Sequence, residues 1–323
     1  MYYDHKRKNG KNSSAYYYLP GLLRFYGPAW HLRKLLKKKL ASIEKRPDRD
    51  YIIDRVNYYN KLSPGADLGA NPSRLSNLSV INGKSTYVLD TQEYSRWFPK
   101  KLRWNCRFGD VTQVPEVPSI VKSRPINGDN ANSVLLNLDK KRHFIFLDDK
   151  HRFNEKENRC IFRGKIDYKP NRILFMEQFF GHPKVDAMAL MAKSEEFQKW
   201  NTMEQMTLWY HLKYKYIMAL EGNDVASNLK WVMSSNSVAV SPKMVYETWF
   251  MEGRLVPGKH FIEVKPDFSD LLEKLEYYDA HPEEAQAIAR NANEYVEQFL
   301  DPERETLISL AVLDKYFTMT GQR

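Results

Sequence analysis

Patterns typical of buried strands and of helices alternate along the second half of the chain. Apolar runs that predict buried strands lie at 142–147, 159–163, 214–220, 237–241 and 260–264. Helical patterns lie between several of them, at 170–180, 202–212 and 224–234. Strands that alternate with helices predict a parallel sheet with crossover helices. We therefore expect an α/β fold whose second half is Rossmann-like.

The remaining segments give fewer signals. Pro282, followed by two glutamates, predicts the first turn of a helix that extends to about residue 300, and a last helix is expected at about 302–318. Turn-rich segments in the first hundred residues separate short candidate strands such as 85–90. The apolar content of 42% and the length of 323 residues allow two domains of ordinary size.

The segment YKYIMALEGNDVASNLKWVMSSNSV at 214–238 joins a strand pattern to a helix pattern. The change of pattern falls at Glu221-Gly222-Asn223-Asp224. A helix that begins after such a turn has amide groups without intrahelical partners, and its peptide dipoles add partial positive charge there. Phosphate is the natural anion for a helix start of this kind.

Several familiar sites are excluded or discounted. The chain has no GxGxxG, HExxH or GxSxG motif, and Cys106 and Cys160 belong to no CxxC or Cys/His cluster. The triplet Asp48-Arg49-Asp50 has a spacing that can hold a divalent metal. It lies among arginines without a preceding apolar strand, so we interpret it as surface salt bridges. We therefore expect no metal site, no resident cofactor and no disulfide framework.

Two more clusters contain residues suited to chemistry on an anionic substrate. Asp110 follows Gly109 on a turn before a proline-rich extended segment, where a carboxylate could face a cleft or could cap the turn. Arg163 and Gly164 end a predicted strand. An arginine there can donate two hydrogen bonds to a diphosphate, or it can pair with a nearby carboxylate.

These clusters, in order, resemble glycosyltransferase family 90. The resemblance rests on GDVTQVP, FRGK, the segment 213–238 and TWFMEGRLVPGKHFIEVKPDFSDL, and covers about 105 to 300. The family includes protein O-glucosyltransferases, capsule xylosyltransferases and bacterial lipopolysaccharide glycosyltransferases. The wording of segments 108–126 and 132–144 is most similar to the bacterial branch.

The resemblance implies a GT-B architecture, in which two Rossmann-like domains face a cleft. We expect an acceptor-side domain at 1–155 and a nucleotide-sugar-binding domain at 156–300. A C-terminal helix at 301–323 is expected to pack back on the first domain. The implied reaction is inverting, metal-independent transfer of a hexose from a nucleotide sugar, here a UDP-hexose, to a lipopolysaccharide or lipooligosaccharide core.

The resemblance also implies roles for individual residues. Asp110 matches the proposed catalytic base. The expected donor-binding residues are Arg163, Gly164, Gly222, Asn223, Asp224, Ser227, Asn228, Lys230 and Glu252. Many relatives carry an arginine where this chain has Asn228, and Asp224 adds negative charge nearby. Either Lys230 and Arg163 compensate, or the donor sits differently in this protein.

Most of the net charge of +10 comes from the first sixty residues, which hold 14 Lys or Arg and 5 Asp or Glu. A predicted amphipathic helix at about 30–43 carries Leu32, Leu35, Leu36, Leu40 and Ile43 on one face. Its other face carries Arg33, Lys34, Lys37, Lys38 and Lys39. This face could bind an anionic membrane surface. The alternatives are a solvated surface helix and, less in keeping with the sequence, nucleic-acid binding.

The expected location follows from what the sequence contains. No apolar segment approaches the roughly 20 residues that span a bilayer, and the charges in MYYDHKRKNGKNSS precede no apolar signal core. We expect a cytoplasmic enzyme, peripheral on the inner membrane, whose partners are a nucleotide sugar and the lipopolysaccharide acceptor. A transferase acting on protein or soluble glycan is one alternative. A noncatalytic nucleic-acid-binding protein is the alternative from another class.

Overall fold

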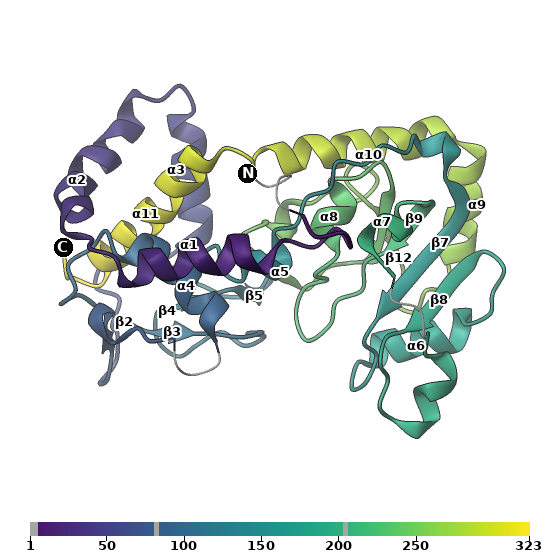
Figure 1. Cartoon of the computed structure of the whole chain (residues 1–323), viewed down its shortest axis with the longest axis horizontal. Helices are drawn as coiled ribbons and strands as arrows, with labels where there is room; N and C mark the ends of the chain where they lie inside the picture. Colours follow the sequence, from purple (N-terminus) through teal and green to yellow (C-terminus); the bar gives the residue numbers. More distant parts are fainter. Residues whose placement is uncertain (1–5, 81–83, 203–205) are drawn as a thin grey trace. The chain divides into compact units, whose positions relative to one another are not determined.

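The computed structural model describes residues 6–80, 84–202 and 206–323, and the chain divides into two compact units (Figure 1). Unit 1 comprises residues 1–13, 142–244 and 252–298, and unit 2 comprises 14–141, 245–251 and 299–323. The domain boundaries expected at 155 and 300 assume two continuous segments and a returning helix. In the observed division, the segments of the two units are interleaved.

Unit 1 is built on a five-stranded sheet in which every neighbouring pair of strands is parallel. The strand order is β12-β10-β9-β7-β8. The bounds are β7 Glu157–Gly164, β8 Val185–Ala189, β9 Tyr214–Met218, β10 Val238–Pro242 and β12 Ile262–Val264. Four of these five strands were expected from apolar runs. The parallel α/β class predicted from the sequence is therefore confirmed for this unit.

The central strands of unit 1 lack polar alternation because both faces of the sheet are covered. All five residues of β9 are buried, and so are Cys160, Ile161 and Phe162 of β7. Phe175 of helix α6 (Pro170–Phe179) packs edge-on against Phe162, at 5.2 Å between ring centroids. The apolar core also includes residues of the helices α9 and α10.

The helices of unit 1 follow the strands, as the sequence predicts. They are α6 Pro170–Phe179, α7 Leu208–His211, α8 Leu229–Met233, α9 Leu271–Ala280 and α10 Pro282–Glu297, while α5 Lys140–His143 spans the boundary with unit 2. Pro170 and Pro282 occupy the first turns of α6 and α10, where a missing N–H removes no intrahelical bond.

Three sequence-based expectations in unit 1 are wrong in type or length. Segment 142–147 forms no strand, because α5 takes its first residues and the rest is buried outside the sheet, with the Leu147 amide donating to Ser234 Oγ at 2.8 Å. The helix expected at 224–234 begins only at Leu229. The helix expected at 202–212 is limited to Leu208–His211, and residues 203–205 of that prediction lie outside the described residues.

Unit 2 combines helices with three small sheets. Its helices are α1 Ser14–Tyr26, α2 Trp30–Ala41, α3 Arg49–Tyr59, α4 Ser85–Ser95 and α11 Pro302–Met319. A parallel sheet joins β3 Cys106–Arg107, β4 Ser119–Val121 and β6 Ser133–Leu135. Two antiparallel pairs join β1 Ser73–Arg74 with β2 Arg103–Trp104, and β5 Ser123–Pro125 with β11 Tyr246–Thr248. Both the basic helix and the C-terminal helix expected from the sequence are present.

The strand expected at 85–90 is instead the start of helix α4. Its run of Tyr87, Val88 and Leu89 has strand propensity, but propensity yields to packing context. Thr91 and Tyr94 continue the buried surface of α4, and the Thr91 hydroxyl donates to the Tyr87 carbonyl at 2.6 Å.

A buried ion pair joins α3 to α11 in unit 2, and Figure 1 shows these two helices running beside each other. Arg55 donates to both carboxylate oxygens of Glu305, at 2.5 and 3.1 Å, and both side chains are buried. Trp249 Nε1 donates to the same carboxylate at 2.5 Å, and its ring stacks on Tyr59 at 3.9 Å. The pair therefore fixes three separate segments of unit 2.

Replacing Arg55 by methionine is expected to destabilise the protein by about 3–5 kcal/mol, because it leaves the buried Glu305 carboxylate without its countercharge. Urea unfolding followed by circular dichroism measures this. Arg49→Met on the same helix is the control: Arg49 pairs with Glu44 and Asp50 at the surface, where the cost is about 0–1 kcal/mol. Equal effects of the two changes would contradict the role given to Arg55.

Candidate active site

The chain reverses its direction of travel across the sheet between β7 and β9. From β7 it passes through α6 to β8 on one side, and it then returns to β9 on the other side of β7. In open parallel sheets, ligands bind outside the carboxyl ends of the strands at such a switch point. Here those ends are Gly164 of β7 and Met218 of β9, and the loops that follow them define the candidate site.

Arg172, in the first turn of α6, joins these two loops. Its guanidinium donates to the carbonyls of Lys165 at 2.9 Å, Leu220 at 2.6 Å and Glu221 at 3.1 Å. The neighbouring Asn171 amide donates to the same Glu221 carbonyl at 3.0 Å. A single side chain thereby holds the backbone after β7 and the backbone after β9 against each other.

Two glycines allow the guanidinium to lie there. A Cβ on Gly164 would lie 3.2 Å from Arg172 Nη1, and a Cβ on Gly222 would lie 3.1 Å from Arg172 Nη2. Real Cβ contacts are rarely so short. At Gly164 a Cβ would also lie 2.9 Å from Phe162 Cζ, so the Phe162 ring and Arg172 together leave little space there, whereas at Gly222 Arg172 is the nearest neighbour.

Arg172 brings positive charge to the candidate site without a carboxylate to neutralise it. Throughout the described ranges, no Asp or Glu lies within ion-pair distance of its guanidinium, whose recorded acceptors are carbonyls. Burial lowers the pKa of Arg172 to about 10. This pKa is still well above neutral pH, so the group stays protonated there. A guanidinium has five N–H donors, and three donate to these carbonyls. The remaining donors can serve an anionic ligand.

Arg163 lies next to this site in sequence but is neutralised. Its Nη2 pairs with Asp186 Oδ1 at 2.8 Å, and its Nη1 donates to the carbonyls of Phe162 and Asp186. Burial raises the pKa of Asp186, but hydrogen bonds from Tyr214 and Arg163 outweigh it and hold that pKa below its usual range. The alternative considered from the sequence, an arginine paired with a carboxylate, is what the structure shows. Direct contact with a diphosphate stays a prediction.

Two other expected donor-binding residues, Lys230 and Glu252, contact each other. Lys230 Nζ lies 2.8 Å from Glu252 Oε1, and both side chains are buried. The ammonium also lies over the ring of Phe144, 5.8 Å from its centroid. The structure therefore places this pair inside unit 1 as a neutral unit rather than as exposed positive charge.

The loop after β9 carries the remaining expected donor-binding residues. The Gly222 amide donates to the Asp224 carbonyl at 2.9 Å, and the Asn228 side chain donates to the Met218 carbonyl at 2.9 Å. Asn223 and Ser227 are exposed, whereas the Asp224 side chain is buried. Because α8 has only five residues and begins at Leu229, it gives little support to the expected anion site at a helix start.

Asp110, the expected base, belongs to unit 2. Its Oδ1 accepts a hydrogen bond from Lys122 Nζ at 2.6 Å, and Lys122 is buried while Asp110 is partly exposed. The following Val111 amide donates to Ser123 Oγ at 3.2 Å, which fixes the turn. Asp110 is thus a carboxylate held in one orientation with access to solvent.

The expected membrane-surface residues on α2 separate into three groups. Lys34, Lys37 and Lys38 are exposed, Lys39 pairs with Glu303 at 2.9 Å, and Arg33 lines a cavity described below. The expected apolar face is correct for Leu36 and Ile43, which are buried, but wrong for Leu35, which is 47% exposed. Among the helices that the structure describes, none has the length and apolar character needed to cross a membrane.

The interpretation of the Asp48-Arg49-Asp50 triplet as salt bridges is confirmed. Asp48 pairs with Arg46 at 2.6 Å and with Arg304 at 3.4 Å, and Asp50 pairs with Arg49 at 2.7 Å. Within residues 6–80, 84–202 and 206–323, no three His, Cys, Asp or Glu side chains gather in a way that could hold a metal ion.

Arg172 is the residue that sequence reasoning missed. The signal that could have found it is an arginine in the first turn of the helix directly after the strand that ends in Gly164. Parallel pairing of β7 with β9, which brings the second loop to it, is a tertiary feature that no local pattern reveals.

The comparisons with known proteins define the class of enzyme. A model of the family described as glycosyl transferase family 90 matches residues 137–320. The O-glucosyltransferase LpsA of Dichelobacter nodosus is 41% identical over 294 residues, which cover 90% of this chain and 91% of that protein. Human protein O-glucosyltransferase 3 is 29% identical over 168 residues, which cover 50% of this chain and 32% of that protein. The protein is a glycosyltransferase. It belongs to glycosyl transferase family 90.

Replacing Arg172 by methionine is expected to weaken UDP binding roughly 10- to 150-fold, because a hydrogen bond to a charged group contributes about 1.5–3 kcal/mol. Isothermal titration calorimetry measures the affinity, and a thermal melt confirms that the variant is folded. Arg163→Met is the matched comparison. Equal losses would place both guanidiniums on the diphosphate, and unchanged affinity in Arg172→Met would contradict the site.

Proposed function

We propose that this enzyme transfers a hexose, with inversion and without a metal ion, from a nucleotide sugar such as a UDP-hexose to a lipopolysaccharide or lipooligosaccharide core. The observation that carries the proposal is the half-buried Arg172 at the switch point of the parallel sheet, which has no carboxylate partner among the described residues. Transfer from a nucleotide sugar releases a diphosphate, and positive charge held at the leaving group stabilises the transition state.

In this proposal unit 1 holds the donor. Arg172, Gly164 and Gly222 form the diphosphate site, and the exposed Asn223 and Ser227 lie on the same loop and can contact the sugar or the nucleotide. The buried Lys230–Glu252 pair and the hydrogen bond from the Asn228 side chain fix the positions of the loop and the helix that follow β9. Many relatives carry an arginine at the position of Asn228, and here Arg172 supplies the positive charge that Asn228 does not. Arg163 shapes the end of β7 through Asp186.

Unit 2 supplies the base in this proposal, as the acceptor-side domain of a GT-B enzyme does. Asp110 accepts the proton of the acceptor hydroxyl while the oxygen attacks the anomeric carbon and the carbon–oxygen bond to the nucleoside diphosphate breaks. Direct displacement of this kind inverts the anomeric centre and needs a single carboxylate, with no covalent sugar–enzyme intermediate. General base catalysis contributes about 10²- to 10⁴-fold.

The acceptor follows from the relative with the greater coverage, the O-glucosyltransferase LpsA, and from the exposed lysines of α2. A lipid-linked, phosphorylated acceptor at the inner leaflet would place the enzyme on the cytoplasmic face of the membrane, held by Lys34, Lys37 and Lys38. A protein acceptor is the second candidate, favoured by the likeness to human protein O-glucosyltransferase 3. Transfer of radiolabelled hexose to purified core lipid or to a folded protein domain distinguishes the two.

Asp110→Asn is expected to lower turnover by about 10²-fold or more, since it keeps the shape of the side chain and removes the base. UDP affinity should be almost unaltered, because the carboxylate serves the acceptor hydroxyl. Single-turnover transfer kinetics and calorimetry measure the two quantities. Asp129→Asn, an exposed carboxylate of the same unit, is the control. Normal turnover of Asp110→Asn would move the base to another residue.

Metal independence is tested by chelation. Turnover is expected to survive dialysis against EDTA, because Arg172 supplies the charge that a divalent ion supplies in metal-dependent transferases. The measurement is the rate of UDP release before and after dialysis. Loss of activity that manganese restores would show that a metal ion takes part.

A further inference from the structure

Helix α1 lies on α4 through a narrow inner face. The Tyr17 hydroxyl donates to the Thr86 carbonyl at 3.1 Å, and the Arg24 guanidinium pairs with Glu93 at 3.3 Å. Between them, Gly21 is buried against Leu89, so that the helix backbone approaches α4 closely. Tyr17, Gly21 and Arg24 follow helical spacing, which fixes the rotation of α1 about its axis.

The opposite face of α1 is apolar and exposed. Tyr16, Leu19, Leu23 and Tyr26 recur at intervals of three and four residues, and Trp30 continues the row at the start of α2. Each is between 61% and 74% exposed. Single exposed apolar residues are ordinary, but a continuous row marks a surface that contacts something else. These five residues are the apolar row.

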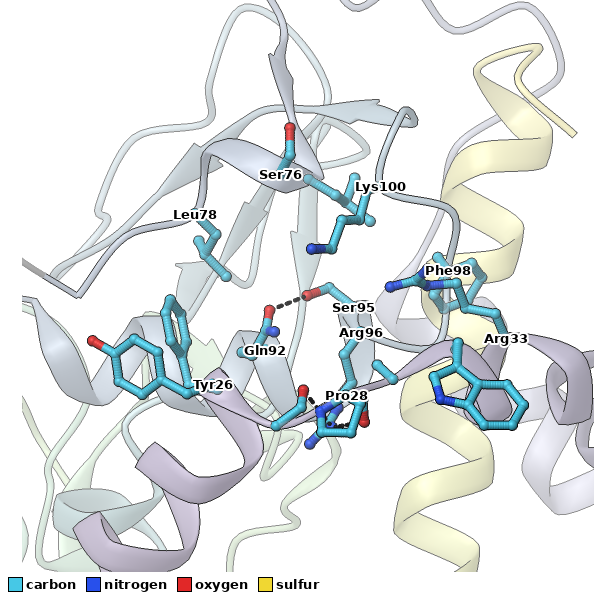
Figure 2. Close-up of a pocket in the computed structure, with 15 residues that line it drawn as sticks. Tyr26, Pro28, Arg33, Ser76, Leu78, Gln92, Ser95, Arg96, Phe98 and Lys100 are labelled. Carbon is cyan, nitrogen blue, oxygen red and sulfur yellow. Dashed lines mark hydrogen bonds between the residues drawn. The ribbon is translucent and has the colours of Figure 1, made fainter.

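A cavity of about 390 Å³ opens where α1 meets α2, next to the end of the apolar row. Figure 2 shows the ammonium of Lys100 and the guanidinium of Arg33 extending toward the space beside Ser95, with Arg96 below them. Its size falls within the range of ligand sites. Among the described residues that line it, which include Tyr26 and Trp30 of the row, there is no Asp or Glu.

The charges in this cavity are not neutralised. For Arg33, Arg96 and Lys100, the described parts of the chain provide no carboxylate within ion-pair distance. Arg96 Nη2 donates to the carbonyls of Gly27 and Pro28, yet Arg96 Nε and Arg33 Nε are buried and have no hydrogen-bond partner among the described residues. Buried donors without acceptors are costly, and an anion in the cavity would satisfy them.

We propose that this surface docks on an anionic lipid bilayer, with the phosphate of one lipid headgroup held in the cavity by Arg33, Arg96 and Lys100 and the apolar row lying in the interface. Tyr and Trp are favoured where the bilayer meets water, and guanidinium groups match phosphate geometry. Lys34, Lys37 and Lys38 are exposed on the same helix as Arg33 and add attraction to anionic headgroups. The inference rests on the membrane attachment in the proposed function and assigns it a site.

A bilayer suits this surface better than a second copy of the chain. If the apolar row packed on its own copy, the basic groups of α2 beside it would approach their equivalents, and like charges across an interface are unfavourable. An anionic bilayer satisfies both the apolar and the basic parts of the surface at once.

The test uses the full-length protein and three variants. Arg33→Gln/Lys100→Gln removes charge from the cavity, and Leu19→Gln/Leu23→Gln removes apolar surface from the row. Lys259→Gln/Lys265→Gln is the control, because it removes two exposed lysines of unit 1. Cosedimentation with vesicles of phosphatidylcholine, with and without phosphatidylglycerol, measures binding. Titration with glycerol phosphate distinguishes a soluble phosphate ligand from a lipid.

We expect the cavity variant to lose roughly 10- to 30-fold in binding to vesicles that contain phosphatidylglycerol, from about fivefold for each cation near an anionic surface. The row variant should lose binding to the same vesicles. The control variant should bind like the unaltered protein, and all should bind UDP equally. Glycerol phosphate should compete only weakly, because it lacks the acyl chains.

Three results would overturn the inference. The first is that the cavity and row variants bind vesicles normally while a variant with Lys34→Gln, Lys37→Gln and Lys38→Gln does not. Membrane attachment would then be supported, but the cavity and the apolar row would not be its site. Strong competition by glycerol phosphate would show a soluble phosphate ligand. A dimer by sedimentation velocity that the row variant dissociates, with vesicle binding unchanged, would make the surface an interface between copies. Loss of UDP binding in the unaltered protein would instead contradict the proposed reaction alone.

Discussion

The candidate site depends on parallel pairing of β7 with β9, because only that pairing places the loops after Gly164 and Met218 at the same edge of the sheet. Arg172 then converts proximity into a defined geometry by donating to carbonyls of both loops. The same contacts position the guanidinium and leave its charge available. The carbonyls that fix the guanidinium carry no net charge, so they orient the cation without neutralising it, as a carboxylate would.

The basic side chains described here fall into two sets, those that pair with a carboxylate and those that do not. Arg55 and Lys230 each pair with a buried carboxylate and Arg163 pairs with the half-buried Asp186, and their contribution is to packing and rigidity. Arg172 and the cavity residues Arg33 and Lys100 have none among the described residues, and these are the groups for which we propose anionic ligands. Burial alone would not make the distinction, since Arg163 of the first set and Arg172 and Arg33 of the second are all half-buried.

The sequence predicted those features that local patterns determine. Four of the strands in the large sheet, the helices that begin at Pro170 and Pro282, and the segments at Gly164 and Gly222 were all expected. The apolar segment 142–147 misled because burial, and not strand pairing, explains its composition. Residues 85–90 misled because packing overrides the propensity of Val88. Other segments of the chain supply the partners of Arg163, Arg172 and Lys230. Residue spacing along the sequence therefore could not show which of these charges are neutralised.

The interleaved segments of the two units also constrain how the polypeptide acquires its structure. Unit 2 includes residues near the start of the chain, the short segment 245–251 and the last helix α11, while unit 1 is completed by residues up to 298. During synthesis, the partner of Arg55 is therefore added some 250 residues after Arg55 itself. Multidomain chains commonly fold from the N-terminal domain onward as they emerge. Helix α3 can form its contacts with α11 only after residues 302–319 have been made, so the α3 surface that carries Arg55 lacks its partner until then.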